Sequence, residues 1–219
     1  MNNCEDLHRE SMKNTTDKTK IYNNWATSYD SYVKSLNYVG PKEIVKKMCD
    51  YTKKFQYLKI LDFGCGTGLV GEEILKQFKI DTFIDGIDIS ENMISKAKEK
   101  NIYDNIFNID IQKDDFDTKS LDKYDIIISS GVFLEGHVKF QTIDKLLDIL
   151  KPNGYIFITI RDSYKNTVIE SESESNLENE DKISFYKYFE SVDKKAKGAH
   201  IESINYLDGV NCSSVVIIK

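Results

Sequence analysis

Residues 59–71 read KILDFGCGTGLVG, and this stretch decides the fold. Residues 60–63 are mostly apolar, which is typical of a short buried strand. Gly64, Gly66 and Gly68 follow at alternate positions, and a helical pattern begins after them. Glycine tolerates unusual φ angles and lets a ligand approach the backbone closely. Because the N–H groups that open a helix point toward the end of the preceding strand, the stretch predicts a nucleotide-like ligand at the carboxyl edge of an open α/β sheet.

Two classes of ligand fit this glycine turn. Residues 66–71 match G-x-G-x-x-G, the dinucleotide fingerprint. In that fingerprint the first glycine follows the strand directly, but here Gly64 holds that place, and Leu69 stands where the third glycine would be needed. An acidic residue before a G-x-G-x-G turn, here Asp62, instead resembles motif I of the class I S-adenosylmethionine-dependent methyltransferases. We favour the methyltransferase interpretation and keep a nicotinamide-dependent oxidoreductase as the alternative.

Length and composition restrict the class of protein. The chain has 219 residues, the size of one α/β domain, and a formal net charge of −6 with both signs mixed along it, so no basic stripe favours nucleic acid. The four cysteines show no C-x-x-C spacing, so we expect neither disulfides nor a metal site. No apolar run of about 18 residues and no signal-peptide core are present. We therefore expect no membrane span and a cytoplasmic location; the oligomeric state stays open.

The N-terminal quarter predicts a tail followed by helices. Residues 1–18 are polar and aperiodic and predict a loose tail, so a single domain is expected over residues 19–219. Gly40-Pro41 ends one helix and begins another, which gives N-terminal helices over about residues 19–55. The apolar stripe of the first helix comprises Tyr22, Trp25, Ala26, Tyr29, Val33 and Leu36. A helix with such an aromatic stripe either packs in the core or forms a lid over the cofactor site, and the two roles are compatible.

Acidic residues end the next two predicted strands. Residues 83–89 (FIDGIDI) predict the second strand, and Asp88 ends it 20 residues after Gly68. A carboxylate at that distance can accept hydrogen bonds from both hydroxyls of a ribose. Residues 105–111 (NIFNIDI) predict a third strand with Asp110 near its end. The alternatives are a surface role for Asp88 and a turn-starting role for Asp110.

The remaining pattern predicts four more strands. Residues 124–130 (YDIIISS) predict a buried fourth strand, and residues 131–138 after it should cross the carboxyl edge and face the transferred group. The fifth strand is predicted at residues 155–160. Two closing strands, at residues 200–207 and 214–218, have no helix-length crossover between them and predict an antiparallel pair. Glu170–Asp181 is acidic and predicts a solvated helix or loop, with a cover over the substrate as the minority alternative.

Residues 21–219 together resemble the class I methyltransferases. The segments YNNWATSYDSYVKSLNYVGP, LDFGCGTGLV, SSGVFLEGHV, LKPNGYIFITIRDSY and INYLDG resemble, more narrowly, the Williams–Beuren syndrome chromosome-region methyltransferase-like proteins. The resemblance implies an α/β, Rossmann-like class I methyltransferase fold. That fold has a seven-stranded, mostly parallel sheet with a C-terminal antiparallel hairpin and helices on both faces. The implied cofactor is S-adenosyl-L-methionine, whereas the methyl acceptor is not supplied by the resemblance.

The resemblance also implies roles for individual residues. Asp62 and the three turn glycines surround the methionine end, Asp88 takes the ribose, and Asp110 takes the adenine amino group between two isoleucines. Serines after the fourth strand offer backbone groups to the cofactor, and the aromatic helix closes over its methionine side. The expected cofactor-binding residues are Tyr22, Trp25, Tyr29, Asp62, Gly64, Gly66, Gly68, Asp88, Ile89, Met93, Asp110, Ile111, Ser129 and Ser130.

The predicted activity is transfer of a methyl group to a small-molecule or protein acceptor by in-line displacement. This reaction needs alignment and exclusion of water more than covalent help, so no catalytic residue is assigned. His137, with Glu135 two residues before it, lies near the expected site, but a lone loop histidine is more often structural. The lack of an assignable catalytic side chain motivates a second hypothesis, an S-adenosylmethionine-binding protein without transferase activity. The sequence shows no Asp/Asn-Pro-Pro-aromatic motif and no Pro-Cys motif, and their absence disfavours nucleic acid as the substrate.

Overall fold

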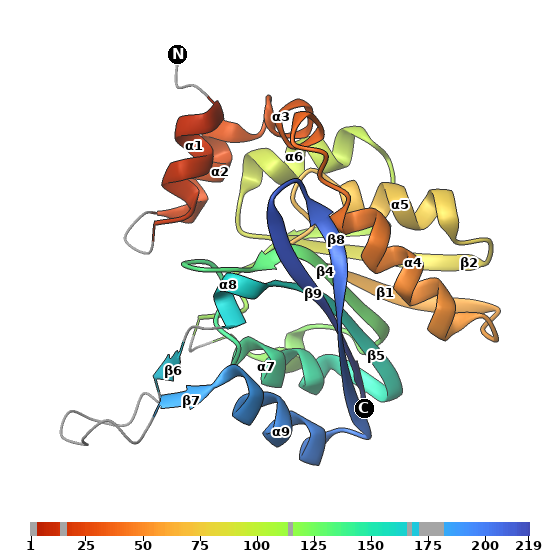
Figure 1. Ribbon diagram of the computed structural model, residues 1–219. Helices are drawn as coiled ribbons and strands as arrows, with labels where there is room; N and C mark the ends of the chain where they lie inside the picture. Colours follow the sequence, from red (N-terminus) through yellow and green to blue (C-terminus); the bar gives the residue numbers. More distant parts are fainter. Residues whose placement is uncertain (1–3, 14–16, 114–115, 166–167, 171–181) are drawn as a thin grey trace.

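The structure, a computed structural model, describes residues 4–13, 17–113, 116–165, 168–170 and 182–219. A seven-stranded sheet with the strand order β3-β2-β1-β4-β5-β9-β8 forms its centre (Figure 1). The sheet comprises β1 (Tyr57–Phe63), β2 (Asp81–Asp88), β3 (Asn105–Asn108), β4 (Tyr124–Phe133), β5 (Leu150–Arg161), β8 (Gly198–Leu207) and β9 (Val210–Ile218).

Strands β1 to β5 pair in parallel, and β9 is antiparallel to both β5 and β8. This confirms the predicted sheet and its C-terminal hairpin. The strand that precedes the glycine turn, β1, lies inside the sheet between β2 and β4.

Helices cover both faces of the sheet, as expected. In Figure 1, α4 and α5 lie on one face, and α7 and α9 lie on the other. A separate two-stranded sheet joins β6 (Val168–Glu170) to β7 (Lys182–Ser184). The helices are α1 (Cys4–Ser11), α2 (Lys18–Trp25), α3 (Tyr29–Ser35), α4 (Gly40–Thr52), α5 (Leu69–Gln77), α6 (Glu91–Glu99), α7 (Thr142–Ile149), α8 (Asp162–Lys165), α9 (Phe185–Lys195) and a short 3₁₀ turn (Thr118–Ser120).

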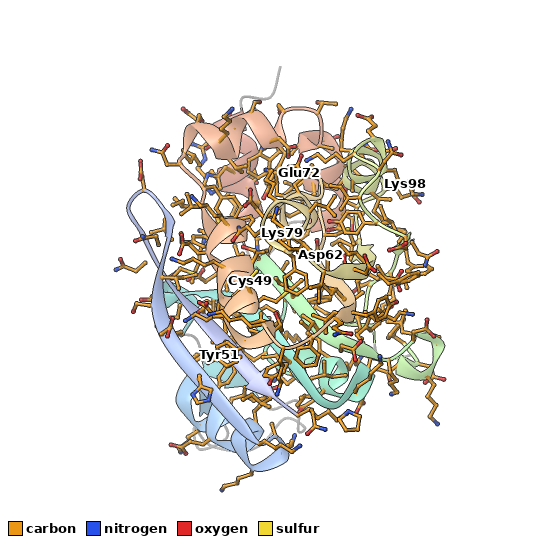
Figure 2. The ribbon with its side chains drawn as sticks, turned by 90° about the vertical axis from the view of Figure 1, so that its right-hand side faces the viewer. Cys49, Tyr51, Asp62, Glu72, Lys79 and Lys98 are labelled. Carbon is orange, nitrogen blue, oxygen red and sulfur yellow. The ribbon has the colours of Figure 1, made fainter. Side chains whose placement is uncertain are left out.

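The two faces of β1 build two apolar cores. Successive side chains of a strand point to opposite faces. Leu58 and Ile60 therefore join the core under α4 and α5, whereas Leu61 joins the core under α7 and α9. Cys49 and Tyr51 lie at the rim of the first core (Figure 2). Because both faces are covered, the ends of the parallel strands are the part of the sheet left for ligands.

The N-terminal segment differs from the prediction in two ways. Residues 4–11, expected within a loose tail over residues 1–18, form α1, and Leu7 of this helix is 6% exposed and packs in a cluster with Trp25. With a single leucine in eight residues, α1 has no apolar period for a sequence pattern to detect. The expected continuous helix is divided into α2 and α3, since Ser28 bonds back to the carbonyl of Trp25 through both its N–H and its hydroxyl.

The other boundaries differ less. Strand β3 ends at Asn108 instead of Ile111, and β5 begins at Leu150 instead of at residue 155. Of the acidic stretch Glu170–Asp181, residues 171–181 lie outside the described residues. No helix in the described part of the chain has the length and apolar character that crossing a membrane requires.

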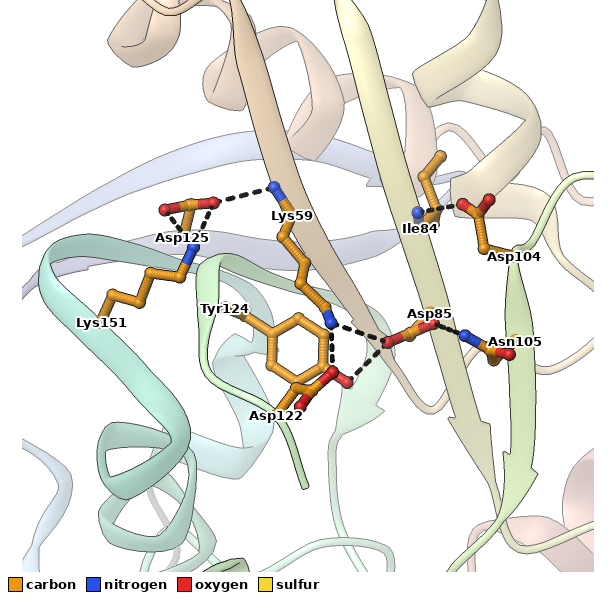
Figure 3. A network of polar contacts seen from close by, with 9 residues as sticks. All are labelled: Lys59, Ile84, Asp85, Asp104, Asn105, Asp122, Tyr124, Asp125 and Lys151. Carbon is orange, nitrogen blue, oxygen red and sulfur yellow. Dashed lines mark hydrogen bonds and ion pairs between the residues drawn. The ribbon is translucent and has the colours of Figure 1, made fainter. Parts of the chain in front are cut away.

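A polar network ties strands together away from the glycine turn (Figure 3). Asp85 of β2 is 2% exposed and accepts hydrogen bonds from Tyr124 Oη at 2.9 Å and from Asn105 Nδ2 at 2.8 Å. Lys59 of β1 lies 3.9 Å from the same carboxylate and also pairs with Asp122. Buried polar groups must find such partners, so this network favours one strand order over others.

Replacing Tyr124 by Phe tests this network. We expect Tyr124→Phe to lower the free energy of unfolding by about 1–2 kcal/mol, because Asp85 loses a buried donor but keeps Asn105. The matched control is Tyr57→Phe, whose side chain is 55% exposed and should change stability by less than about 0.5 kcal/mol. Urea denaturation measures both variants, and equal effects would contradict the network's role.

Candidate functional site

A cavity opens at the carboxyl edge of β1, β2 and β4. Its floor is the backbone of Gly64 and Gly66, and its wall includes Tyr22 and Tyr29 from the N-terminal helices. The sequence-predicted residues that line it are Tyr22, Tyr29, Gly64, Gly66, Asp88, Ile89, Met93, Asp110, Ile111 and Ser130. Segments far apart in the chain therefore meet at the place where the glycine turn predicted a ligand.

The glycine turn leaves bare backbone facing this cavity. Gly64 has a φ of +70°, and a Cβ added there would lie 2.4 Å from Val132 Cγ2, so a side chain fits neither the conformation nor the space. Gly66 has a φ of +54°, and no atom of the described residues comes within 4 Å of a Cβ added to it. The space above Gly66 is thus left free for a ligand.

Carboxylates stand at the two strand ends beside the turn. Asp88 accepts from the N–H of Gly66 and from the N–H of Ser90, each at 2.8 Å. Burial raises the pKa of Asp88, while these backbone N–H groups act in the opposite direction and hold the carboxylate in place. Asp110 accepts from the N–H of Gln112 at 3.0 Å. Each carboxylate keeps lone pairs with which it can accept from a ligand.

Asp62 lies behind the glycine turn instead of on the cavity wall. This residue, labelled in Figure 2, is fully buried and accepts a hydrogen bond from Tyr103 Oη at 2.6 Å through Oδ2. Its Oδ1 has no hydrogen-bond partner among the described residues. Burial raises the pKa of Asp62 to about 7. The hydrogen bond from Tyr103 lowers this pKa, whereas the negative charge of Asp88 raises it further. Asp62 therefore does not belong to the residues that line the cavity, and its predicted contact with the cofactor stays a prediction.

Three more predicted residues lie outside the cavity wall. Trp25 is 2% exposed and packs edge-on against Tyr29, with ring centroids 5.0 Å apart. Ser129 is buried and donates to the carbonyl of Phe63 at 2.7 Å. Gly68 has a φ of +93° and caps α5. These residues position the wall without forming it.

The N-terminal helices are attached to the cavity rim by polar side chains that sequence reasoning missed. Asn23 Oδ1 accepts from Ser90 Oγ at 2.7 Å and from the N–H of Asn92 at 3.1 Å. Asp30 accepts from Thr67 Oγ1 at 2.5 Å and pairs with Lys100 at 2.8 Å. The only sequence signal is that Asn23 and Asp30 each directly follow one of the two tyrosines.

His137 closes the wall against Tyr22. Its Nδ1 lies 2.9 Å from the carbonyl oxygen of Glu135, which can only accept, so Nδ1 carries the proton. Nε2, 2.8 Å from Tyr22 Oη, then accepts from the tyrosine hydroxyl when the ring is neutral. Burial lowers the pKa of His137 to about 4, so the ring is neutral near pH 7. In this arrangement His137 fastens the N-terminal helices to the loop after β4.

Several wall residues were not named as site residues from the sequence. Three of them, Gly131, Val132 and Val138, belong to the stretch at residues 131–138 that was expected to face the transferred group. Ile87 and Ile109 directly precede positions that were predicted, which is the signal that could have found them. The remaining missed residues are Lys18, Phe63 and Gln112.

Comparison with known proteins agrees with this geometry. The family described as "Methyltransferase domain" matches residues 61–156, the region that carries the glycine turn and the strand-end acids. This match identifies residues 61–156 as a methyltransferase domain. This confirms the broader resemblance predicted from the sequence.

The relatives of this chain include bacterial O-methyltransferases and a human methyltransferase-like protein. The malonyl-[acyl-carrier protein] O-methyltransferase of Halalkalibacterium halodurans is 38% identical over 104 residues, which cover 46% of this chain and 38% of that protein. Methyltransferase-like protein 27 of Homo sapiens, a protein of the Williams–Beuren region, is 25% identical over 162 residues, covering 74% of this chain and 64% of that protein. The chain spans about half the length of the first curated relatives it matches, between 38% and 57%.

Solved structures share the fold of this methyltransferase domain. The plantazolicin methyltransferase BpumL, solved in complex with S-adenosylhomocysteine (SAH), is 19% identical, with a TM-score of 0.59 and coverage of 99% of this chain and 97% of that chain. The predicted Rossmann-like class I methyltransferase fold is thereby confirmed.

The buried histidine gives the methyltransferase domain a pH-dependent stability. The unfolded chain binds a proton at His137 near the ordinary pKa of 6.5, but the folded chain binds it only near 4. The free energy of unfolding should therefore fall as the pH drops from about 6.5 toward about 4. His137→Asn removes this titration, so urea denaturation at about pH 7 and about pH 5 should show a smaller loss for the variant. Parallel losses in the two proteins would show that His137 is not the titrating group.

Proposed function

We propose that the chain binds S-adenosylmethionine in the cavity and transfers its methyl group to a small-molecule or protein acceptor. The observation that carries the proposal is the bare backbone at Gly66, hydrogen-bonded to Asp88 and set beside a second carboxylate, Asp110, in one cavity. A zwitterionic nucleoside needs these features together: acceptors for its hydroxyls and amino groups, and a backbone that it can approach closely.

Each part of the cofactor finds suitable residues on the cavity wall. Asp110 would accept from the adenine amino group, and the apolar side chains of Ile89, Met93 and Ile111 suit the ring. Asp88 would accept from the ribose hydroxyls. The methionine end would lie over the glycine turn, under the two tyrosines of the N-terminal helices.

The bound cofactor supplies a methyl group on a sulfonium, whose leaving group is a neutral thioether. The work left to this chain is to align the acceptor and to keep water out. Tyr22 and Tyr29, braced by Trp25, form the cover, and the bonds of Asn23 and Asp30 hold this cover on the rim. His137 is neutral and its Nε2 is engaged by Tyr22, so this arrangement suits an acceptor atom that is already deprotonated.

The relatives support oxygen as the acceptor atom. The first three are named malonyl-[acyl-carrier protein] O-methyltransferases, and we extend O-methylation to this chain as part of the proposal. A cytoplasmic location and the absence of nucleic acid among the partners stay predictions from the sequence.

The sheet disfavours the nicotinamide alternative. An ordinary dinucleotide domain continues in parallel beyond its fifth strand, in the order 3-2-1-4-5-6. Here the neighbour of β5 is the antiparallel β9. The second hypothesis, an S-adenosylmethionine-binding protein without transferase activity, is separated from an enzyme by the methyl-transfer experiment described next.

Calorimetry with S-adenosylmethionine, SAH and NADH tests the proposal. We expect both sulfur ligands to bind with micromolar dissociation constants and NADH to give no heat. Binding of NADH with no heat from the sulfur ligands at millimolar concentration would contradict the proposal. Labelled methyl transfer to a panel of oxygen acceptors then separates an enzyme from a binding protein without turnover.

Gly66→Ala should weaken binding of the cofactor while the fold persists. A Cβ at Gly66 meets no described atom, so it should project into the ligand space. The matched control is Gly209→Ala in the turn between β8 and β9, where φ is +74° and the described residues again leave a Cβ free space. Both variants should lose about 1–2 kcal/mol of stability from the left-handed backbone. Calorimetry should show a loss of SAH affinity of about tenfold or more for Gly66→Ala alone; equal affinity in both variants would place the ligand elsewhere.

A further inference from the structure

A second cavity adjoins the first under the N-terminal helices. The two share Tyr22, Tyr29 and Gly131 in their walls, so they meet beside the carboxyl-terminal end of β4. The far side of the second cavity carries Tyr206 and Arg161 from the closing hairpin and the end of β5. A molecule in the second cavity would therefore reach the ligand of the first from the side that carries the two tyrosines.

Arg161 brings a positive charge to this second cavity, and no carboxylate of the described residues forms an ion pair with it. Its Nε is buried and has no hydrogen-bond partner among the described residues. Its Nη1 donates to Met12 Sδ at 3.5 Å, and a thioether is a weak acceptor. The guanidinium carbon lies 5.9 Å from the centre of the Tyr206 ring. The adjacent carboxylate, Asp162, pairs with Lys165 at 2.7 Å instead.

The other arginine of the chain shows the contrast. Arg9 is 70% exposed in its side chain and pairs with Asp6 at 2.5 Å. In the described part of the chain, no carboxylate makes such a pair with Arg161. A cation that is partly removed from water without an anion is costly, and an anionic ligand would offset that cost.

The charge of Arg161 reaches both cavities. After burial, it is the next cause that lowers the pKa of His8 on α1, and it also contributes to the lowered pKa of His137 at the first cavity. Arg161 thus acts electrostatically on ionisable groups beside both cavities.

We propose that the second cavity binds the methyl acceptor as a carboxylate anion, with Arg161 as its anchor. This inference rests on the proposed methyl transfer. The planar guanidinium can donate two parallel N–H bonds to a carboxylate, a geometry that an ammonium cannot match.

The reaction balances without a base. A lone pair of the carboxylate oxygen forms the new C–O bond to the methyl carbon, and the C–S bond breaks with its electrons passing to sulfur. An anion and a sulfonium cation become a neutral ester and a neutral thioether, and no proton is released. A carboxylate is already ionised at neutral pH, which fits a site whose histidine is neutral and engaged by Tyr22.

The test measures ligand binding by the full chain saturated with SAH. Butyrate, glutarate and phenylacetate are each compared by calorimetry with the matching carboxamide at millimolar concentration. We expect the wild-type chain to bind at least one acid about tenfold more tightly than its amide. Arg161→Gln should abolish this preference, Arg161→Lys should keep part of it, and Arg9→Gln should keep all of it.

Each other outcome overturns the inference in a distinct way. Wild-type protein that binds SAH but prefers no acid over its amide overturns the carboxylate acceptor alone. A preference that survives in Arg161→Gln overturns the anchor. A loss of SAH affinity of about tenfold in Arg161→Gln, with its thermal unfolding unchanged, would assign Arg161 to the carboxylate of the cofactor itself. Wild-type protein that fails to bind SAH overturns the proposed function and this inference together.

Discussion

The hydrogen bond from the Gly66 N–H to the Asp88 carboxylate joins the ends of two neighbouring strands, and the site depends on it. It holds the turn after β1 against the end of β2, with the N–H groups of Gly64 and Cys65 bonded to the carbonyl of Ile87 beside it. Because these hydrogen bonds hold the turn in place, its backbone is exposed to a ligand in a fixed conformation. The same carboxylate then serves both the turn and the cavity, which explains why an acid stands at a strand end where its pKa is raised.

The elements that could be predicted are those with strong local patterns. Strand β1, the glycine turn and Asp88 follow from apolar runs, glycine spacing and strand ends, all of which are short-range signals. The C-terminal hairpin was predictable because no crossover separates its strands. Asp62 shows the limit of this reasoning: its position in the motif is recognisable, but the alternation along β1 turns its side chain to Tyr103, behind the turn. Arg161 was missed because a lone cation at a strand end carries no pattern; its meaning comes from the absence of a described carboxylate partner.

The cover of the site combines two kinds of contact. Aromatic packing of Trp25 with both tyrosines gives it a stiff body, and Asn23 and Asp30 attach that body to the loops after β2 and β1. The tyrosine–histidine bond adds a third attachment from the loop after β4. Three strand ends therefore share one cover, so its seating depends on the whole carboxyl edge of the sheet.

Helix α1 has a role that its modest sequence conceals. His8, Ser11 and Met12, at its C-terminal end, form part of the outer wall of the second cavity, so the helix stands between that cavity and solvent. Leu7 contributes most of the apolar burial of α1, on the order of 2 kcal/mol. Side-chain contacts of Cys4 with Ser28 and of His8 with Tyr32 add to this burial, and undocking these eight residues should cost less than unfolding the sheet. The sparse apolar content that hid α1 from sequence patterns thus also limits how firmly this helix closes the second cavity.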